Sequence, residues 1–412
     1  MKNSIFNFPA TRREFISASA KGTGLLAFSQ FVPAFLRDSV AKQAPLPEKD
    51  RRILVLVQLA GGNDGLNTLI PYEDSNYYRL RPSLGIRKED ALPLTDDLGF
   101  HQSCQGMKEL FDEGLLSIVQ NVGYPNPNRS HFRSMEIWET AAESDEYRSS
   151  GWLGRYLDNN CSGAPEIGEP EAVSFGNEIP ITVQGDEAHN LFALNNRFGR
   201  AAKRLDYGLL DNMVGKSSSK DNSSYLKHTM MDTLITERRI QALFAKFKPS
   251  VAYPNHPLGI SLSNVASLIS AEIPTRVYFV SLGGFDTHQG QVNRHQSLLK
   301  NLSSSLLAFQ KDLQSKGLED QVLTMTFSEF GRRASENQSG GTDHGTSAPL
   351  FVMGSKLGDS IVGQAPDLNL GKNKDLTFST DFRQVYATVL DHWLDCDSRT
   401  VLGQKFQPLP II

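Results

Sequence analysis

Continuous apolar runs bounded by polar loops constrain the fold of this chain more than any other feature of its sequence. The runs lie at 51–60 (RRILVLVQLA), 115–123, 275–284, 321–331 and 349–354. Strands that are apolar on both faces are typical of a parallel sheet covered by helices. Segments with apolar residues at helical spacing lie between the runs or after them, at 103–114, 295–317 and 379–394. This alternation predicts an α/β fold with a largely parallel central sheet flanked by helices.

The middle of the chain breaks this pattern. Residues 216–224 are rich in Ser, Lys and Asn, and a stretch with helical character follows them. We therefore expect one α/β domain over 50–412 that carries a helical insertion or cap at about 205–270.

The N-terminal segment has the layout of an export signal. Arg12 and Arg13 stand in TRREFI, a weakly apolar stretch follows, and small residues (SVAKQA) come next. This order predicts a twin-arginine signal peptide over 1–44, so that the folded protein reaches the periplasm or the exterior through the twin-arginine translocase. The alternative is a basic amphipathic helix that stays attached. Removal of 1–44, which has six Lys or Arg and two Asp or Glu, changes the net charge from −4 to −8.

Composition excludes several classes of function. A net charge of −4 gives no general basic field for nucleic acid. No apolar run is long enough to predict a stable membrane span in the mature form. The three cysteines, Cys104, Cys161 and Cys396, have no CxxC spacing, and one disulfide among them stays possible.

Polar groups suited to metal binding follow or precede each apolar run. They are Asp64 after the first run, Arg129, Ser130 and His131 after the second, Asp286 and His288 after the third, Glu329 and Arg332 at the end of the fourth, and Asp343 and His344 before the fifth. Ligands of open parallel sheets bind beyond the carboxyl ends of the strands. Oxygen and imidazole ligands suit Zn, Mn or Fe better than Ca, and the set is large enough for one or two divalent ions.

Each of these residues also has a structural interpretation. Asp64 suits a glycine-rich turn, and Ser130 suits the N-cap of the helix that follows it. Glu329 has arginines at 332 and 333 as possible ion-pair partners. We interpret three further histidines as outer-layer or structural residues: His101, His131 and His295. The glycines of GTDHGT, around Asp343 and His344, are expected to let the backbone approach a small ligand closely.

Long motifs of the chain resemble a known bacterial family. They are VQLAGGNDGLNTLIPY, YPNPNRSHFRSMEIWET, SLGGFDTH, TMTFSEFGRR, GTDHGTSAPLFVMG and DFRQVYATVL. From about residue 50 onward the sequence is similar to the family called domain of unknown function 1501, and so is the export signal. That family in turn resembles the alkaline phosphatase and sulfatase superfamily, which implies an alkaline-phosphatase-like fold.

The resemblance to the superfamily implies roles for individual residues. Asp64 matches an aspartate that bridges two metals, and Ser130 matches a nucleophile at a helix start. Asp286 and His288 resemble the ligands of one metal, although their spacing is tighter. A later histidine of the superfamily matches His344.

The sequence departs from the superfamily at the end of the fourth run. An Asp-His pair is usual there, but this chain has Glu329 followed by Phe330. Either Glu329 replaces the aspartate and the histidine is missing, or Asp343 and His344 are the displaced pair. Both alternatives imply a single-metal site or a site that has lost catalysis.

The predicted function is hydrolysis of phosphate or sulfate esters. One or two divalent metals would be held among Asp64, Asp286, His288, Glu329, Asp343 and His344. Ser130 would attack phosphorus or sulfur, while Arg129 or Arg332 holds the other ester oxygens. The alternative is a non-catalytic binding or assembly protein of the cell envelope. A nucleotide-binding oxidoreductase has no support, because no GxGxxG follows a strand.

Overall fold

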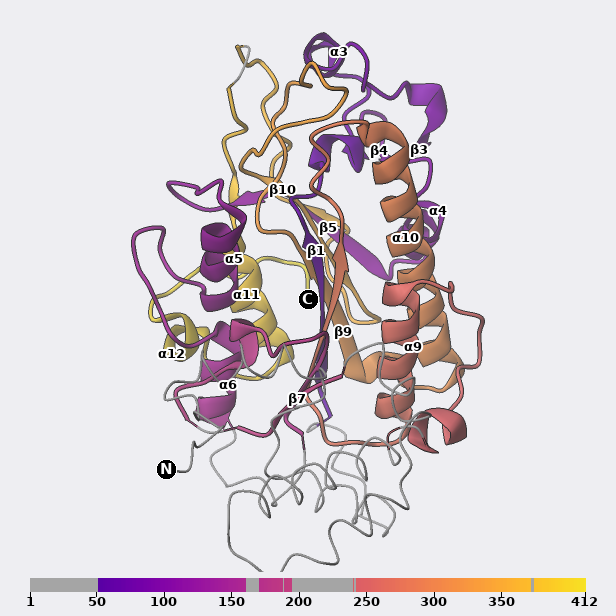
Figure 1. Ribbon diagram of the computed structural model, residues 1–412, viewed down its shortest axis with the longest axis vertical. Coiled ribbons are helices and arrows are strands. Elements are labelled where there is room, and N and C mark those ends of the chain that lie inside the picture. The colour runs from indigo at the N-terminus through magenta and orange to yellow at the C-terminus, as the bar shows by residue number, and fades with distance from the viewer. Residues whose placement is uncertain (1–50, 161–169, 188, 195–239, 241, 372–373) are drawn as a thin grey trace, which may run out of the picture.

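The computed structural model describes residues 51–160, 170–187, 189–194, 240, 242–371 and 374–412 (Figure 1). The predicted signal peptide at 1–44 and most of the predicted insertion at 205–270 lie outside these residues. So does Cys161, whereas Cys104 and Cys396 are buried.

A mixed sheet forms the centre of the molecule, as predicted. Its order is β11-β5-β10-β9-β1-β8-β6-β7, and β12 also pairs with β5. The strands are β1 (Ile53–Ala60), β5 (Leu116–Gly123), β6 (Ala172–Phe175), β7 (Leu191–Ala193), β8 (Val277–Gly283), β9 (Val322–Phe327), β10 (Ala348–Met353), β11 (Ile361–Val362) and β12 (Thr380–Asp381).

Within the described part of the sheet, β10 is the strand that runs against the others. It pairs antiparallel with β9 and with β5, whereas β1 pairs parallel with both β8 and β9. The start of β10 therefore lies beside the end of β5, with Ala348 opposite Val122. The loop that precedes β10 is thereby brought to the edge where the parallel strands end.

Helices cover both faces of the sheet (Figure 1). One layer holds α4 (Gln105–Asp112), α9 (Pro257–Ser270) and α10 (Gln291–Ser315), and the other holds α5 (His131–Thr140), α6 (Trp152–Asn160), α11 (Phe382–Thr388) and α12 (Ser398–Leu402). The predicted helices at 103–114, 295–317 and 379–394 correspond to α4, α10 and α11. A π-helical turn, η7 (Val389–Trp393), continues α11. The described end of the predicted insertion forms α9, which packs against β8 and α10.

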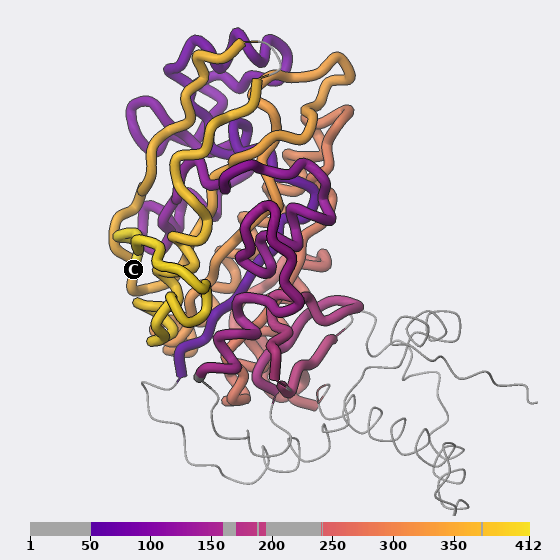
Figure 2. The backbone as a smooth tube through the Cα atoms, turned by 90° about the vertical axis from the view of Figure 1, so that its left-hand side faces the viewer, coloured from indigo at the N-terminus to yellow at the C-terminus, as the bar shows by residue number. Residues whose placement is uncertain are grey.

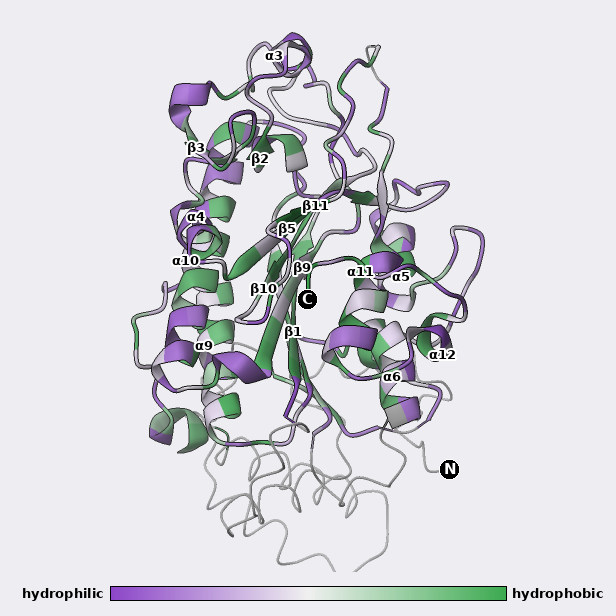
Figure 3. Cartoon of the chain, turned by 180° about the vertical axis from the view of Figure 1, so that it is seen from behind, coloured by the Kyte–Doolittle hydropathy of each residue, from purple (hydrophilic) through white to green (hydrophobic). Residues whose placement is uncertain are grey.

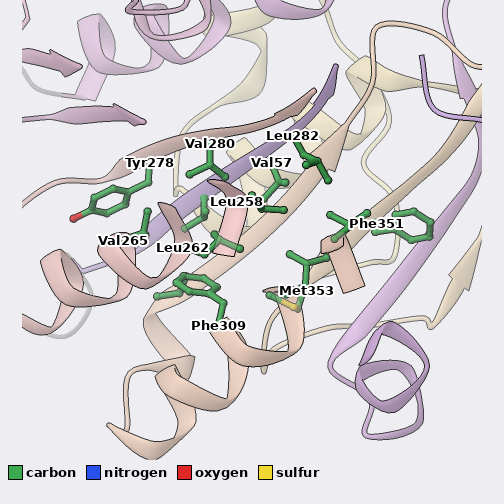
Figure 4. Close-up of a cluster of buried hydrophobic side chains, with 14 of the residues drawn as sticks. Val57, Leu258, Leu262, Val265, Tyr278, Val280, Leu282, Phe309, Phe351 and Met353 are labelled. Carbon is green, nitrogen blue, oxygen red and sulfur yellow. The ribbon is translucent and has the colours of Figure 1, made fainter. Parts of the chain in front are cut away.

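Side chains point alternately to the two faces of the sheet, so the hydrophobic core has two halves, one on each face. Val57 of β1 joins the core under α9 and α10, whereas the preceding Leu56 joins the core under α5 and α11. Successive strand side chains point to opposite faces, so an apolar strand supplies both cores at once. Figure 4 shows the first of them, in which Val57 and Val280 of the sheet lie near Leu258 and Leu262 of α9.

A smaller layer covers one end of the sheet. It contains a second sheet, of order β2-β4-β3, and a short helix. Its elements are η2 (Gly65–Asn67), β2 (Leu69–Ile70), α3 (Ser75–Leu80), η3 (Lys88–Asp90), β3 (Ala91–Pro93) and β4 (Gly99–His101). The chain between β11 and β12 reaches the same end (Figure 2), where Arg79 donates to the carbonyls of Leu368 and Leu370.

Apolar residues concentrate in the strands and on the inner faces of the helices (Figure 3). Two short 3-10 turns, η4 (Ile181–Val183) and η6 (Glu319–Gln321), complete the described elements. Within the described ranges, every helix is too short or too polar to cross a lipid bilayer.

Candidate metal centre

Three histidine rings and one carboxylate meet where the strands end. Asp286 and His288 follow β8, His344 precedes β10, and His131 is the first residue of α5. The Oδ1 atom of Asp286 lies 3.0 Å from Nε2 of His288, 3.1 Å from Nε2 of His344 and 3.6 Å from Nε2 of His131. Ligand atoms of His131, Asp286 and His344 all lie within 4.8 Å of one another, and His288 adjoins this group through Asp286 and His344. We call the four side chains, which come from three separate segments, the histidine-aspartate centre.

In each histidine of the centre, the second ring nitrogen, Nδ1, lies near a hydrogen-bond acceptor. Nδ1 of His131 lies 2.8 Å from Oε1 of Glu329, and Nδ1 of His288 lies 3.3 Å from Oδ1 of Asp343. Nδ1 of His344 lies 2.9 Å from the carbonyl oxygen of Arg129. Carbonyl and ionised carboxylate oxygens only accept, so a neutral ring that donates from Nδ1 directs the lone pair of Nε2 toward Asp286.

Neutral histidine rings in this arrangement are better suited to coordinating a cation than to contacting each other. With Nδ1 protonated, each neutral ring has a lone pair on Nε2. The Nε2 atoms of His288 and His344 are only 2.9 Å apart, so two lone pairs would face each other beside a carboxylate if both rings donate from Nδ1. A divalent cation at about 2.0–2.1 Å from each nitrogen would replace this repulsion with coordination. Imidazole and carboxylate ligands together suit Zn, Mn or Fe.

Local charges keep the carboxylate ionised. Burial alone would raise the pKa of Asp286, but Arg332, His344 and His288 together outweigh burial and lower the pKa to about 2. Burial also lowers the pKa of His344, which favours its neutral ring, although Asp286 acts in the opposite direction. A hydrogen bond from Asn337 lowers the pKa of Asp343. At neutral pH the centre therefore presents anionic oxygen.

Arg332, predicted to hold substrate oxygens, is instead buried beneath the centre. Its side chain is 0% exposed. The guanidinium donates to Asp286 at 2.6 Å and to four carbonyl oxygens, which are those of Gly61, Gly62, Phe285 and Thr342. With its donors used in this way, Arg332 fixes the loops after β1 and β8 and is not available to a substrate.

Glu329 and Phe330 are buried residues that contact the histidine-aspartate centre. Glu329 was predicted as a metal ligand, but its Oε1 accepts from His131 and, at 2.8 Å, from the backbone N–H of Gly61. The Phe330 ring packs 4.9 Å from the ring of His131 and 4.7 Å from that of His344. A Cβ on Gly62 would lie 2.5 Å from the Phe330 ring, so a glycine there makes room for it. Phe330 thus packs against two of the histidine rings and offers no ligand atom of its own.

Asp64, predicted to bridge two metals, lies in a different set of contacts. Its fully buried carboxylate pairs with Arg81 at 2.7 Å and accepts a hydrogen bond from Gln291. Burial alone would raise the pKa of Asp64, but Arg81 lowers it overall. Arg81 also holds the carbonyls of Arg333 and Ala334. Asp64 therefore joins the smaller layer to the sheet and lies outside the group of residues that could hold a metal ion.

Ser130 and Arg129 lie at the edge of the centre, directly before His131. Ser130 is the exposed N-cap of α5, yet its hydroxyl makes no capping hydrogen bond. Arg129 was predicted to hold ester oxygens, but its guanidinium pairs with Asp375, whose side chain is 14% exposed. The carbonyl of Arg129 is the part of this residue that reaches His344.

The glycines of the GTDHGT loop serve the packing of loops, not the approach of a ligand. A Cβ on Gly341 would lie 2.4 Å from the carbonyl oxygen of Thr287, and one on Gly345 would lie 2.5 Å from the carbonyl carbon of Arg332. Arg332 and His344 also form an isolated antiparallel bridge. These close backbone contacts hold Asp343 and His344 against the Asp286 loop.

Sequence reasoning missed His131 as a member of the centre. The signal was available, because His131 follows the second apolar run as closely as the serine before it does. The orienting carbonyl of Arg129 and the buried partner Arg81 had no such signal. Their roles depend on contacts with residues distant in sequence.

The family comparison agrees with the motifs. The model of the family described as protein of unknown function (DUF1501) matches residues 265–407, about a third of the chain. The matched segment contains four of the six motifs that carry the resemblance, and it includes Asp286, His288 and His344. No curated protein matches the chain.

Solved structures with related architecture have very different sequences. The C-terminal periplasmic domain of EcEptC from Escherichia coli, in complex with Zn, is 10% identical over 76% of this chain and 74% of that chain, with a TM-score of 0.36. The lipoteichoic acid synthase LtaP from Listeria monocytogenes is 7% identical over 77% and 70%, with a TM-score of 0.33. A protein in the alkaline phosphatase superfamily from Vibrio parahaemolyticus is 10% identical over 78% and 68%, with a TM-score of 0.33. At these values the matches decide nothing about activity.

Proposed function

We propose that this protein is a hydrolase of phosphate or sulfate esters that depends on one divalent metal and uses Ser130 as its nucleophile. The observation that carries the proposal is the convergence of three histidine Nε2 atoms on the Asp286 carboxylate, with Ser130 directly before His131 as the N-cap of α5. His131, His288, His344 and Asp286 would hold the metal. When bound, the metal would supply Lewis-acid stabilisation of negative charge on the ester oxygens.

The residues of the chain supply the remaining chemistry. The Ser130 hydroxyl stands free at the start of a ten-residue helix, where backbone N–H groups and the helix dipole favour an anion. Its Oγ would form a bond to phosphorus or sulfur as the ester bond to the alcohol breaks. The proton leaves with the released alcohol, and water then cleaves the seryl ester and restores the hydroxyl.

Replacement of Ser130 by alanine is expected to reduce kcat on the order of 10⁴-fold while the metal content stays unchanged. The measurement is turnover of a panel of phosphate and sulfate esters, with metal content determined on the same samples. Ser304→Ala, which removes a half-buried hydroxyl in the middle of α10, is the matched control. Normal turnover by Ser130→Ala would remove the nucleophile assignment. A metal-loaded wild type that cleaves no ester would favour the non-catalytic alternative.

We also propose that the folded protein is exported, on the basis of Arg12 and Arg13 in TRREFI. Replacement of both arginines by lysine is expected to retain the full-length chain in the cytoplasm, because the translocase reads the arginine pair. Cell fractionation followed by detection of the protein measures this. An undiminished periplasmic or extracellular pool of the double variant would show that another route is used.

A further inference from the structure

Phe132 is an exposed aromatic side chain at the edge of the histidine-aspartate centre. It follows His131 directly and lies two residues after Ser130, in the first turn of α5. Its side chain is 91% exposed, the highest value among the large hydrophobic residues that the structure shows as exposed. Exposing an aromatic ring to water is unfavourable, and this ring lies directly after one residue of the centre.

The helix that carries Phe132 is firmly anchored. Ser134 donates a hydrogen bond to the carbonyl of Glu329, and its hydroxyl lies 2.7 Å from that of Tyr124. Ile137 and Trp138 are buried in the core under α5. The exposed ring therefore stands on a rigid element, and its exposure is imposed by the direction of the helix face.

A second exposed aromatic ring lies beside the same turn. Tyr147 is 76% exposed, and the guanidinium carbon of Arg133 lies 3.8 Å from the centre of its ring. Arg133 follows Phe132 and is itself fixed by the carbonyls of Glu143, Ser144 and Glu146. Arg133 thus positions the ring of Tyr147 near the first turn of α5.

We propose that Phe132 forms a subsite for a flat ring in the alcohol part of the ester. This inference rests on the proposed function and adds the class of alcohol to it. An aromatic face binds another aromatic ring or the C–H face of a sugar by contact over the whole ring. The adjoining exposed loop 125–130 is PNPNRS, with polar side chains at four of six positions. The apolar area is therefore the size of one ring, far below that of a stable protein interface.

Binding of non-hydrolysable analogues to the metal-loaded full chain tests the subsite without turnover. We expect isothermal titration calorimetry to show that wild type binds phenylphosphonate about tenfold more tightly than methylphosphonate. Phe132→Ala is expected to bind the two analogues equally, with its melting temperature unchanged because the ring is exposed. Ile260→Ala, which removes an exposed side chain from α9, is expected to keep the wild-type preference. A glucosyl phosphonate measured alongside shows whether the subsite prefers a sugar or an aryl ring.

Equal binding of both analogues by wild type, or an unchanged preference in Phe132→Ala, would overturn the ring subsite and leave the proposed hydrolase intact. Failure of every phosphonate to bind the metal-loaded wild type would overturn the subsite together with the proposed function on which it rests.

Discussion

Asp286→Asn is expected to weaken binding of a divalent metal by on the order of 1000-fold, more than the 10–100-fold that is usual for loss of an outer partner. The carboxylate lies within 3.6 Å of all three Nε2 atoms, and without its charge the centre retains only neutral nitrogen ligands. An asparagine oxygen still accepts from Arg332, so the fold should persist. Titration calorimetry with zinc measures the affinity, and circular dichroism checks the fold.

Asp145→Asn is the matched control, since Asp145 lies on an exposed loop after α5. A graded response is expected from Glu329→Gln, which keeps an oxygen for His131 but removes the charge that makes its ring a stronger ligand. We expect about a tenfold loss of affinity there. Unchanged zinc affinity in Asp286→Asn would show that any bound metal lies elsewhere.

Arg332→Met is expected to lower the free energy of unfolding by about 3–5 kcal/mol. The change leaves the carbonyls of Gly61, Gly62, Phe285 and Thr342 without their buried donor. It also removes the cation that lowers the pKa of Asp286. Urea unfolding at neutral pH measures the loss.

The neighbouring Arg333→Met is the control for this substitution. The side chain of Arg333 is 24% exposed, and its Nε lies 3.8 Å from Oδ1 of Asp375, a longer and weaker contact. We expect it to change stability by about 1 kcal/mol or less. A stable Arg332→Met protein that had lost only turnover would restore the catalytic role that the sequence suggested.

The sheet was predictable because its signal is local. Strands buried on both faces must be apolar throughout, so β1, β5, β8, β9 and β10 are each visible in the sequence as an apolar run. The direction of β10 was not predictable in this way, since the composition of an apolar run does not indicate whether the strand pairs parallel or antiparallel. Because β10 is antiparallel, the loop with Asp343 and His344 reaches the strand ends even though it precedes its strand.

For the histidine-aspartate centre, the sequence predicted the approximate location but not the contacts of the individual residues. Because Asp64, Asp286 and Glu329 each follow a strand, the sequence placed them at one edge of the sheet. It did not indicate which residue each of them would contact. Asp64 meets Arg81 and Glu329 meets His131, and both contacts depend on the path of loops that carry no regular pattern. Which buried charges pair with each other depends on the three-dimensional path of the chain. Residues that occupy equivalent positions after a strand in the sequence therefore have different roles.

The most direct test of the histidine-aspartate centre is a crystal structure of the zinc-loaded protein, with anomalous diffraction measured on both sides of the zinc absorption edge. A single peak is predicted within about 2.0–2.3 Å of Nε2 of His131, His288 and His344 and of the Asp286 carboxylate. A map with no peak among these four groups, or with its peak beside Asp64, would contradict the account.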